Sequence, residues 1–192
     1  MPHTRLVFFQ DANGDAPVWE WLKVLRTGNP KGYAKCVVRI RRLVECGYEL
    51  RRPEADLLRD GIYKLRARLG TVNYRVLYSE TLKMRSQKTQ KRTSDALALV
   101  EQLTGKSQQM ADLVEQEQAS LDIARKIYEL RTKAKLSQVE LARKVGTTQS
   151  VISRLEDADY DGHSLQMLRR IASALEQRVE IRFLPSLKLQ PA

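Results

Sequence analysis

Cysteine and histidine are scarce in this chain. Its 192 residues contain two cysteines, Cys36 and Cys46, and two histidines, His3 and His163. The cysteine spacing is neither Cys-x-x-Cys nor a zinc-finger pattern, and the histidines lie far from the cysteines in sequence. We therefore expect no metal site and no cofactor, and we expect both thiols to be buried or half-buried in a helical stretch.

Long apolar runs are also missing. No stretch approaches the ~20 consecutive apolar residues that a membrane-spanning helix needs. The first residues also lack the apolar core of a secretory signal peptide. These two absences argue against a membrane protein and predict a protein of the reducing cytoplasm.

Positive charge is plentiful but unevenly distributed. The hydrophobic fraction of 42% is enough for one large or two small folded domains, and the formal net charge is +11. Residues 1–90 contain 18 Lys and Arg against 9 Asp and Glu, a net charge of +9, whereas residues 91–192 contain 16 against 14, a net charge of +2. The basic first half therefore predicts a polyanionic or acidic partner of its own, and RNA is the obvious candidate.

The most informative segment is residues 136–156, whose pattern predicts two short helices around a glycine turn. Ser137 and Glu140 have the spacing of a capping box, and Gly146 is suited to end the first helix. The apolar positions of the second helix are expected to pack on those of the first: Val151, Ile152 and Leu155 against Val139, Leu141, Ala142 and Val145. This pattern predicts a helix-turn-helix that reads DNA.

The outward face of this helix pair carries polar side chains suited to DNA. Glutamine can bond adenine at two positions, arginine can do so to guanine, and short hydroxyls reach phosphates or bases. We predict that bases are read by Gln149, Ser150 and Arg154. We predict that the phosphate backbone is held by Gln138, Thr147, Thr148 and Ser153. An ordinary helical hairpin with a polar exposed face is the alternative.

Two resemblances support the DNA-binding interpretation. Residues 145–149, with Leu155 and Glu156, look like the helix-turn-helix of lambdoid phage repressors. The wider run through residues 149–159 and 163–168 is similar to HigA-type antitoxins, and this resemblance covers about residues 84–185. It implies that the second half binds operator DNA as a homodimer.

The rest of the second half is predicted to be helical up to a final strand. Helices are expected from Ser94 to about Gly105, over residues 108–133, and from Ser164 to Leu175. The early part of the second of these is acidic and could cover basic surface of the first half, or simply be solvated. Residues 178–184 alternate apolar and charged side chains, which predicts a strand. We expect it to pair with its copy in a dimer through Val179, Ile181 and Phe183, with the edge of the first-half sheet as the alternative partner.

The first half is predicted to be a small α+β domain. Strands are expected over residues 4–9, 62–69 and 72–78, and helices over residues 17–25 and 32–46. Gly70 and Thr71 form a two-residue hairpin loop, so that Leu69 pairs with Val72. One face of the hairpin is then apolar. The other face carries Lys64, Arg66, Arg68, Asn73, Arg75 and Leu77. Because like charges directly across a sheet repel, this face predicts an anionic ligand or an acidic partner.

A resemblance to a toxin family gives these cations a possible role. Residues 50–68 and 72–78 resemble HigB-type toxins of the RelE superfamily, in which such a surface holds mRNA for metal-independent cleavage on the ribosome. The resemblance implies RNA binding by Lys64, Arg66, Arg68 and Arg75. Such cleavage also needs a base and an acid, and the chain plainly supplies only the cations, so the catalytic residues are unidentified. The family's further strand and terminal histidine or lysines are absent or replaced by the segment from Met84 onwards.

The sequence therefore predicts an α+β chain of two parts. Residues 1–83 form a truncated RelE-like toxin domain, residues 84–93 a basic linker, and residues 94–192 a HigA-like helix-turn-helix antitoxin with a C-terminal dimerisation strand. The predicted function is a toxin-antitoxin fusion that represses its own transcription, with a neutralised or inactive toxin half. Two alternatives remain: a ribosome-dependent endoribonuclease inhibited in cis, and a module that captures a separate cognate toxin. The operator, and whether the halves pack in cis or across a dimer, stay open.

Overall fold

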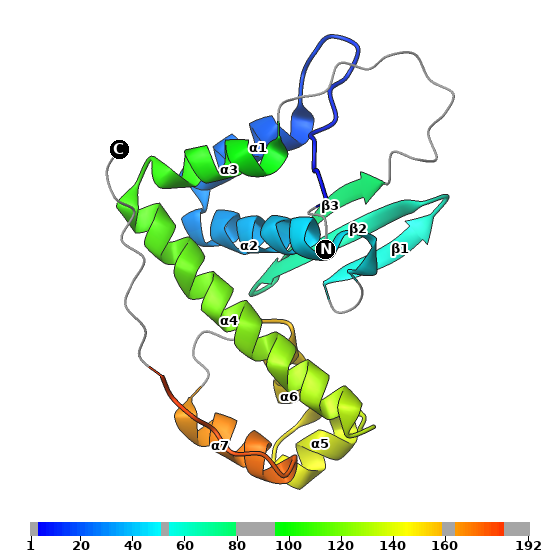
Figure 1. Ribbon diagram of the computed structural model, residues 1–192, viewed down its shortest axis with the longest axis vertical. Coiled ribbons are helices and arrows are strands. Elements are labelled where there is room, and N and C mark those ends of the chain that lie inside the picture. The colour runs from blue at the N-terminus through cyan, green and yellow to red at the C-terminus, as the bar shows by residue number, and fades with distance from the viewer. Residues whose placement is uncertain (1–3, 51–53, 80–94, 159–163, 183–192) are drawn as a thin grey trace.

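The computed structural model describes residues 4–50, 54–79, 95–158 and 164–182, and it is a mixed α+β fold. The elements of its first part are helices α1 (Pro17–Gly28) and α2 (Pro30–Cys46), the 3-10 turn η1 (Gly47–Glu49), and strands β1 (Ala55–Arg59), β2 (Ile62–Leu69) and β3 (Val72–Ser79). The helices that follow are α3 (Ala96–Gly105), α4 (Gln108–Lys133), α5 (Gln138–Val145), α6 (Gln149–Glu156) and α7 (Leu165–Ala174). Helix α4 runs from the end that holds α1, α2 and α3 to the end that holds α5, α6 and α7 (Figure 1).

The predicted hairpin is confirmed residue by residue. Strands β2 and β3 pair in antiparallel register from Leu69 with Val72 to Lys64 with Leu77, which places Arg66 directly opposite Arg75. Leu65 and Ala67 are buried on the face toward α2, as the alternation predicts. Because the turn fixes the register and the pattern fixes the faces, the hairpin follows from local sequence alone.

Two parts of the sheet differ from the sequence prediction. Strand β1, which we did not predict, pairs antiparallel with β2 and gives the strand order β1-β2-β3. Residues 4–9, predicted as a strand, form only an isolated bridge between Val7 and Asp95. The run at 4–9 is apolar enough for a strand, but it packs beside α1 and the start of α3 instead of joining the sheet. A partner distant in sequence, at Asp95, decided the outcome for residues 4–9, whereas β1 joins β2 through the short turn at Asp60 and Gly61.

Helix boundaries follow local capping signals. Helix α2 begins after Asn29, whose side chain accepts a hydrogen bond from the Gly32 amide (3.0 Å). Helix α3 is capped by Asp95, which accepts from the Leu97 amide (2.9 Å), whereas the expected cap Ser94 lies outside the described residues. Ser164 caps α7 as predicted. No helix in the described ranges is long and apolar enough to cross a bilayer.

The hydrophobic core is shared between segments on either side of residues 80–94. The larger cluster joins Tyr33 and Val37 of α2 with Val100 of α3 and with Val114 and Leu121 of α4. Helices α2 and α3 are also tied by the ion pair of Arg41 and Glu101, with both nitrogen–oxygen distances at 2.7 Å. The helices over residues 96–124 thus pack onto the first half of the chain within one molecule.

A second hydrophobic cluster lies under the helix-turn-helix. Its buried members are Ile127, Leu141, Ala142, Val145, Ile152, Leu155, Ile171 and Leu175. It is contributed by the end of α4 together with α5, α6 and α7. Residues 178–182, predicted as part of a strand, pair with no strand within the described part of this single chain, and Ile181 is 57% exposed. The rest of the predicted strand, Phe183 and Leu184, and the predicted linker at 84–93 lie outside the described residues.

Candidate nucleic-acid interface

The capping box at the start of α5 is present as predicted. The Ser137 amide donates to Glu140 Oε2 (2.7 Å), and the Glu140 amide donates to Ser137 Oγ (3.2 Å). These bonds stabilise the charged carboxylate, so the hydrogen bonds from the Ser137 backbone and hydroxyl lower the pKa of Glu140. The start of α5 is therefore fixed by its own sequence.

The turn between α5 and α6 is held from two sides. Gly146 adopts the left-handed conformation at φ 69°, and the Thr147 amide donates to the Ala142 carbonyl (2.9 Å). From α7, the Arg170 guanidinium donates to the carbonyls of Val145 and Gly146, the latter at 2.8 Å. These bonds satisfy carbonyls at the C-terminal end of α5 that no helical amide can reach.

Packing between α5 and α6 follows the predicted apolar stripe with one exception. Leu141, Ala142 and Val145 are buried against Ile152 and Leu155. Val139, which we placed in the same stripe, is 63% exposed. Because residues two apart on a helix do not share a face, Val139 cannot point the same way as Leu141.

The residues expected to read bases lie at the surface of α6. Gln149, Ser150 and Arg154 are exposed, and Ser153 is half-buried. Arg154 Nε donates to the Ser150 carbonyl (3.3 Å). At the start of the helix, the hydroxyls of Thr148 and Ser150 share a hydrogen bond of 3.0 Å. Helix α6 therefore presents amide, hydroxyl and guanidinium groups to solvent.

The structure brings Gln138 and Gln149 together, although they belong to different helices. Gln149 Nε2 donates to Gln138 Oε1 (2.8 Å), and Gln138 Nε2 donates to Glu156 Oε2 (2.9 Å). Thr147, which we also predicted to contact phosphates, is half-buried in the turn between α5 and α6. The first residue of α5 thus orients the first residue of α6.

A buried ion pair beneath this face was missed by the sequence reasoning. Arg131 of α4 binds Glu156 at the end of α6 in a bidentate pair, with distances of 2.6 Å to Oε1 and 2.8 Å to Oε2. The hydrogen bonds that Arg131 donates to the Glu156 carboxylate raise the pKa of the Arg131 guanidinium above its usual value. Nothing in local periodicity pairs two residues so far apart in sequence, and a glutamate at the end of α6 looks like an ordinary exposed residue.

This arrangement is that of a helix-turn-helix DNA-binding unit: two short helices, a left-handed glycine turn, and a second helix with an exposed polar face. Residues 127–180 match the helix-turn-helix family. The matched region begins where the second hydrophobic cluster begins, at Ile127. The chain therefore contains a DNA-binding part of the type found in transcription regulators. No curated protein and no solved structure matches the chain.

The cationic residues of the sheet gather at a separate pocket. A cavity of about 170 Å³, which we call the cationic pocket, is lined among others by Arg39, Lys64, Arg66, Arg68, Arg75 and Asp157. Lys64 Nζ lies 4.0 Å from the Asp56 carboxylate, and Arg68 Nε donates to the Gly70 carbonyl (2.9 Å). The guanidinium groups of Arg66 and Arg75 have no hydrogen bond or ion pair with any described residue. In the described ranges, no three His, Cys, Asp or Glu side chains gather as a metal site.

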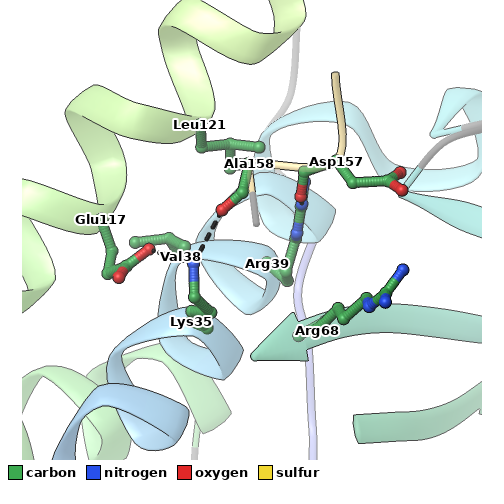
Figure 2. Close-up of a pocket in the computed structure, with 9 residues that line it drawn as sticks. Lys35, Val38, Arg39, Arg68, Glu117, Leu121, Asp157 and Ala158 are labelled. Atoms are coloured by element: carbon green, nitrogen blue, oxygen red, sulfur yellow. Dashed lines mark hydrogen bonds and ion pairs between the residues drawn. The ribbon is translucent and has the colours of Figure 1, made fainter. Parts of the chain in front are cut away.

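The pocket is bounded by the end of α6 because two buried cations of α2 hold that end. Lys35 Nζ donates to the Ala158 carbonyl (2.7 Å) and to Glu117 of α4 (2.9 Å). Arg39 donates to the Asp157 carbonyl (3.0 Å) and to Glu54 (3.1 Å), and burial lowers the pKa of its guanidinium. Figure 2 shows Lys35 and Arg39 reaching from α2 toward Ala158 and Asp157. The C-terminal end of α6 is thus docked on the first half of the chain.

Proposed function

We propose that this protein is a sequence-specific transcriptional repressor that binds operator DNA upstream of its own gene. The observation that carries the proposal is the pairing of Gln149 with Gln138 on an exposed polar face. A glutamine whose carbonyl and amide are held in one orientation can present both groups to adenine in the major groove. Gln149, Ser150 and Arg154 read bases, while Gln138, Thr147, Thr148 and Ser153 contact phosphates.

The repressor acts as a dimer in this proposal. Helix-turn-helix proteins usually place two recognition helices about one DNA turn apart, which a twofold dimer provides. The exposed Ile181, near half-buried Val179, is available to a second chain, and Phe183 follows with the same alternation. Pairing of these segments would form the strand that is not seen among the described residues of a single chain.

The first half, in this proposal, is a toxin remnant of the RelE type without robust nuclease activity. Support comes from the cationic face of the hairpin and from the resemblance of residues 50–68 and 72–78 to HigB-type toxins. Metal-independent RNA cleavage needs a general base close to the 2′-hydroxyl. The described lining of the cationic pocket offers cations, Asn73 and Tyr74, and its single carboxylate, Asp157, belongs to the end of α6.

Binding to DNA tests the main proposal. The full chain is titrated with the duplex from upstream of its own gene and with a scrambled duplex, across a series of salt concentrations. We expect preference for its own DNA, and loss of that preference in Gln149→Ala/Arg154→Ala. The matched control Gln102→Ala/Arg5→Ala removes the same residue types from exposed positions outside the helix-turn-helix. Equal, steeply salt-dependent binding to both duplexes would mean nonspecific attraction and contradict the proposal.

A second candidate function is ribosome-dependent endoribonuclease activity restrained by the second half. The guanidiniums of Arg66 and Arg75 favour it, because two adjacent cations that pair with no described residue suit a phosphate backbone. The full chain is incubated with translating ribosomes and mRNA, and the cleavage ends are mapped. Cleavage that Arg66→Ala abolishes and the control Arg5→Ala retains would favour the nuclease; intact mRNA argues against it.

A further inference from the structure

The cationic pocket lies between the first half of the chain and the end of the recognition helix. Its lining joins the exposed face of β2 and β3 with Arg39 of α2 and with Asp157, the residue that directly follows α6. Among the described residues, five cationic side chains and one carboxylate line it. Since Arg66 and Arg75 stand directly opposite each other without a partner among the described residues, an anion between them would relieve their repulsion.

The chemistry of the lining favours a phosphate group. Guanidinium forks donate two parallel hydrogen bonds and match the geometry of phosphate oxygens. A phosphate monoester carries close to two negative charges at neutral pH. It therefore balances the two adjacent guanidiniums better than a single carboxylate would. Asn73 adds a further polar group to the lining.

The shape of the site favours a compact ligand over a polynucleotide. On one side the pocket ends at Asp157, which is anchored to buried Arg39. A nucleic-acid strand that continued past this side would meet both the end of α6 and the negative charge of Asp157. A small phosphate monoester can occupy the pocket without crossing that boundary.

We propose that the cationic pocket binds a small phosphate monoester and that the bound ligand weakens DNA binding by the helix-turn-helix. This inference rests on the DNA-binding function proposed above. The phosphate competes with the Asp157 carbonyl for Arg39 and repels the Asp157 carboxylate. Both effects loosen the hold of Arg39 on the end of α6, the helix that carries Gln149. By reciprocity, bound DNA lowers the affinity for the phosphate ligand by the same factor.

Ligand binding is tested by calorimetry on the full chain in phosphate-free buffer. The probes are adenosine 5′-monophosphate, inorganic phosphate, uncharged adenosine and a short single-stranded RNA. We expect binding of the monophosphate and of inorganic phosphate but not of adenosine. Binding is expected to be lost in Arg66→Ala/Arg75→Ala and kept in Arg5→Ala/Arg59→Ala, which removes two exposed arginines away from the pocket. Binding of the RNA alone, or binding unaffected by loss of Arg66 and Arg75, overturns the proposal.

Coupling is tested by measuring DNA affinity with and without saturating monophosphate. We expect at least a roughly fivefold weaker DNA affinity with the ligand, within the usual range for two coupled sites. Asp157→Asn keeps the backbone carbonyl but removes the repelling charge, so the ligand effect should shrink. Unchanged or tighter DNA binding with the ligand overturns the coupling. Absence of DNA binding without any ligand contradicts the proposed function instead, and calorimetry still decides whether the pocket binds phosphate.

Discussion

At the residue scale, the buried pair of Arg131 and Glu156 holds the end of α6 against α4. Both side chains are almost fully buried, and Glu156 also accepts from Gln138, which in turn binds Gln149. A buried pair of this kind adds little stability over an apolar pair, but removing one partner leaves a charge without compensation. The pair therefore matters most for the position of α6.

Glu156→Ala is expected to destabilise the fold strongly. It leaves the buried Arg131 guanidinium unpaired, which should lower the free energy of unfolding by roughly 3 kcal/mol. Urea unfolding of the full chain measures the change. The control Glu129→Ala breaks the exposed ion pair that Glu129 makes with Arg125 within α4. It should cost less than about 1 kcal/mol. Equal effects of both substitutions would show that the buried pair has no special role.

At the element scale, the helix-turn-helix depends on its caps. The left-handed Gly146 and the capping box of Ser137 and Glu140 define the two ends of α5. Each acts over a few residues, so each can be tested by a single substitution with a matched control.

Gly146→Ala is expected to lower the stability of the helix-turn-helix. A residue with a Cβ in the left-handed region costs roughly 1–2 kcal/mol, and here the added atom would lie 3.2 Å from the Arg170 guanidinium. Gly105→Ala is the control, because φ is not positive there and a Cβ meets open space. It should leave thermal stability unchanged or slightly raise it. The turn would need no glycine if both variants melted at the same temperature.

The capping box should make α5 sensitive to acid. The pKa of Glu140 is lowered in the folded state from its usual 4.5, so its contribution is present above about pH 4.5 and is lost as the pH falls through the lower folded pKa. Glu140→Gln lacks this titration. The stability difference between the two chains, measured by urea unfolding from neutral pH downwards, should therefore shrink below about pH 4.5. A difference that stays constant with pH would speak against the ionised cap.

At the scale of the whole molecule, the shared core ties the first half to α3 and α4. Leu65 of the sheet, Val37 of α2, Val100 of α3 and Leu121 of α4 belong to one buried cluster. Burial of apolar area is the dominant favourable term in folding, so the first half depends on helices that lie beyond residue 94. Cutting the chain between the halves would expose this surface.

Residues 1–83 alone are expected to fold poorly. Without α3 and α4 the fragment lacks the helices that cover Tyr33 and Val37. Residues 1–124 keep nearly the whole cluster. We expect a cooperative urea transition for residues 1–124 and for the full chain, and none for residues 1–83. A cooperative transition in the shorter fragment would show that the first half is independent of the shared core.

The sequence by itself determined the elements whose cause is local. The capping box, the glycine turn, the register of the β2–β3 hairpin and the N-cap of α7 depend on residues within a few positions of one another. Local rules therefore located the helix-turn-helix and placed Gln149, Ser150 and Arg154 on its surface.

Only the tertiary structure decided which of these elements meet. The bridge of Val7 to Asp95, the pairing of Arg131 with Glu156, and the docking of the end of α6 on Lys35 and Arg39 all join residues distant in sequence. Strand β1 is different, because it pairs with β2 across the short turn at Asp60 and Gly61 and was missed although its cause is local. For Lys35, Arg39, Arg131 and Glu156 the physical reason is that a buried charged group must find a partner somewhere in the fold, because leaving it unpaired is costly. No periodicity within a single segment carries that information.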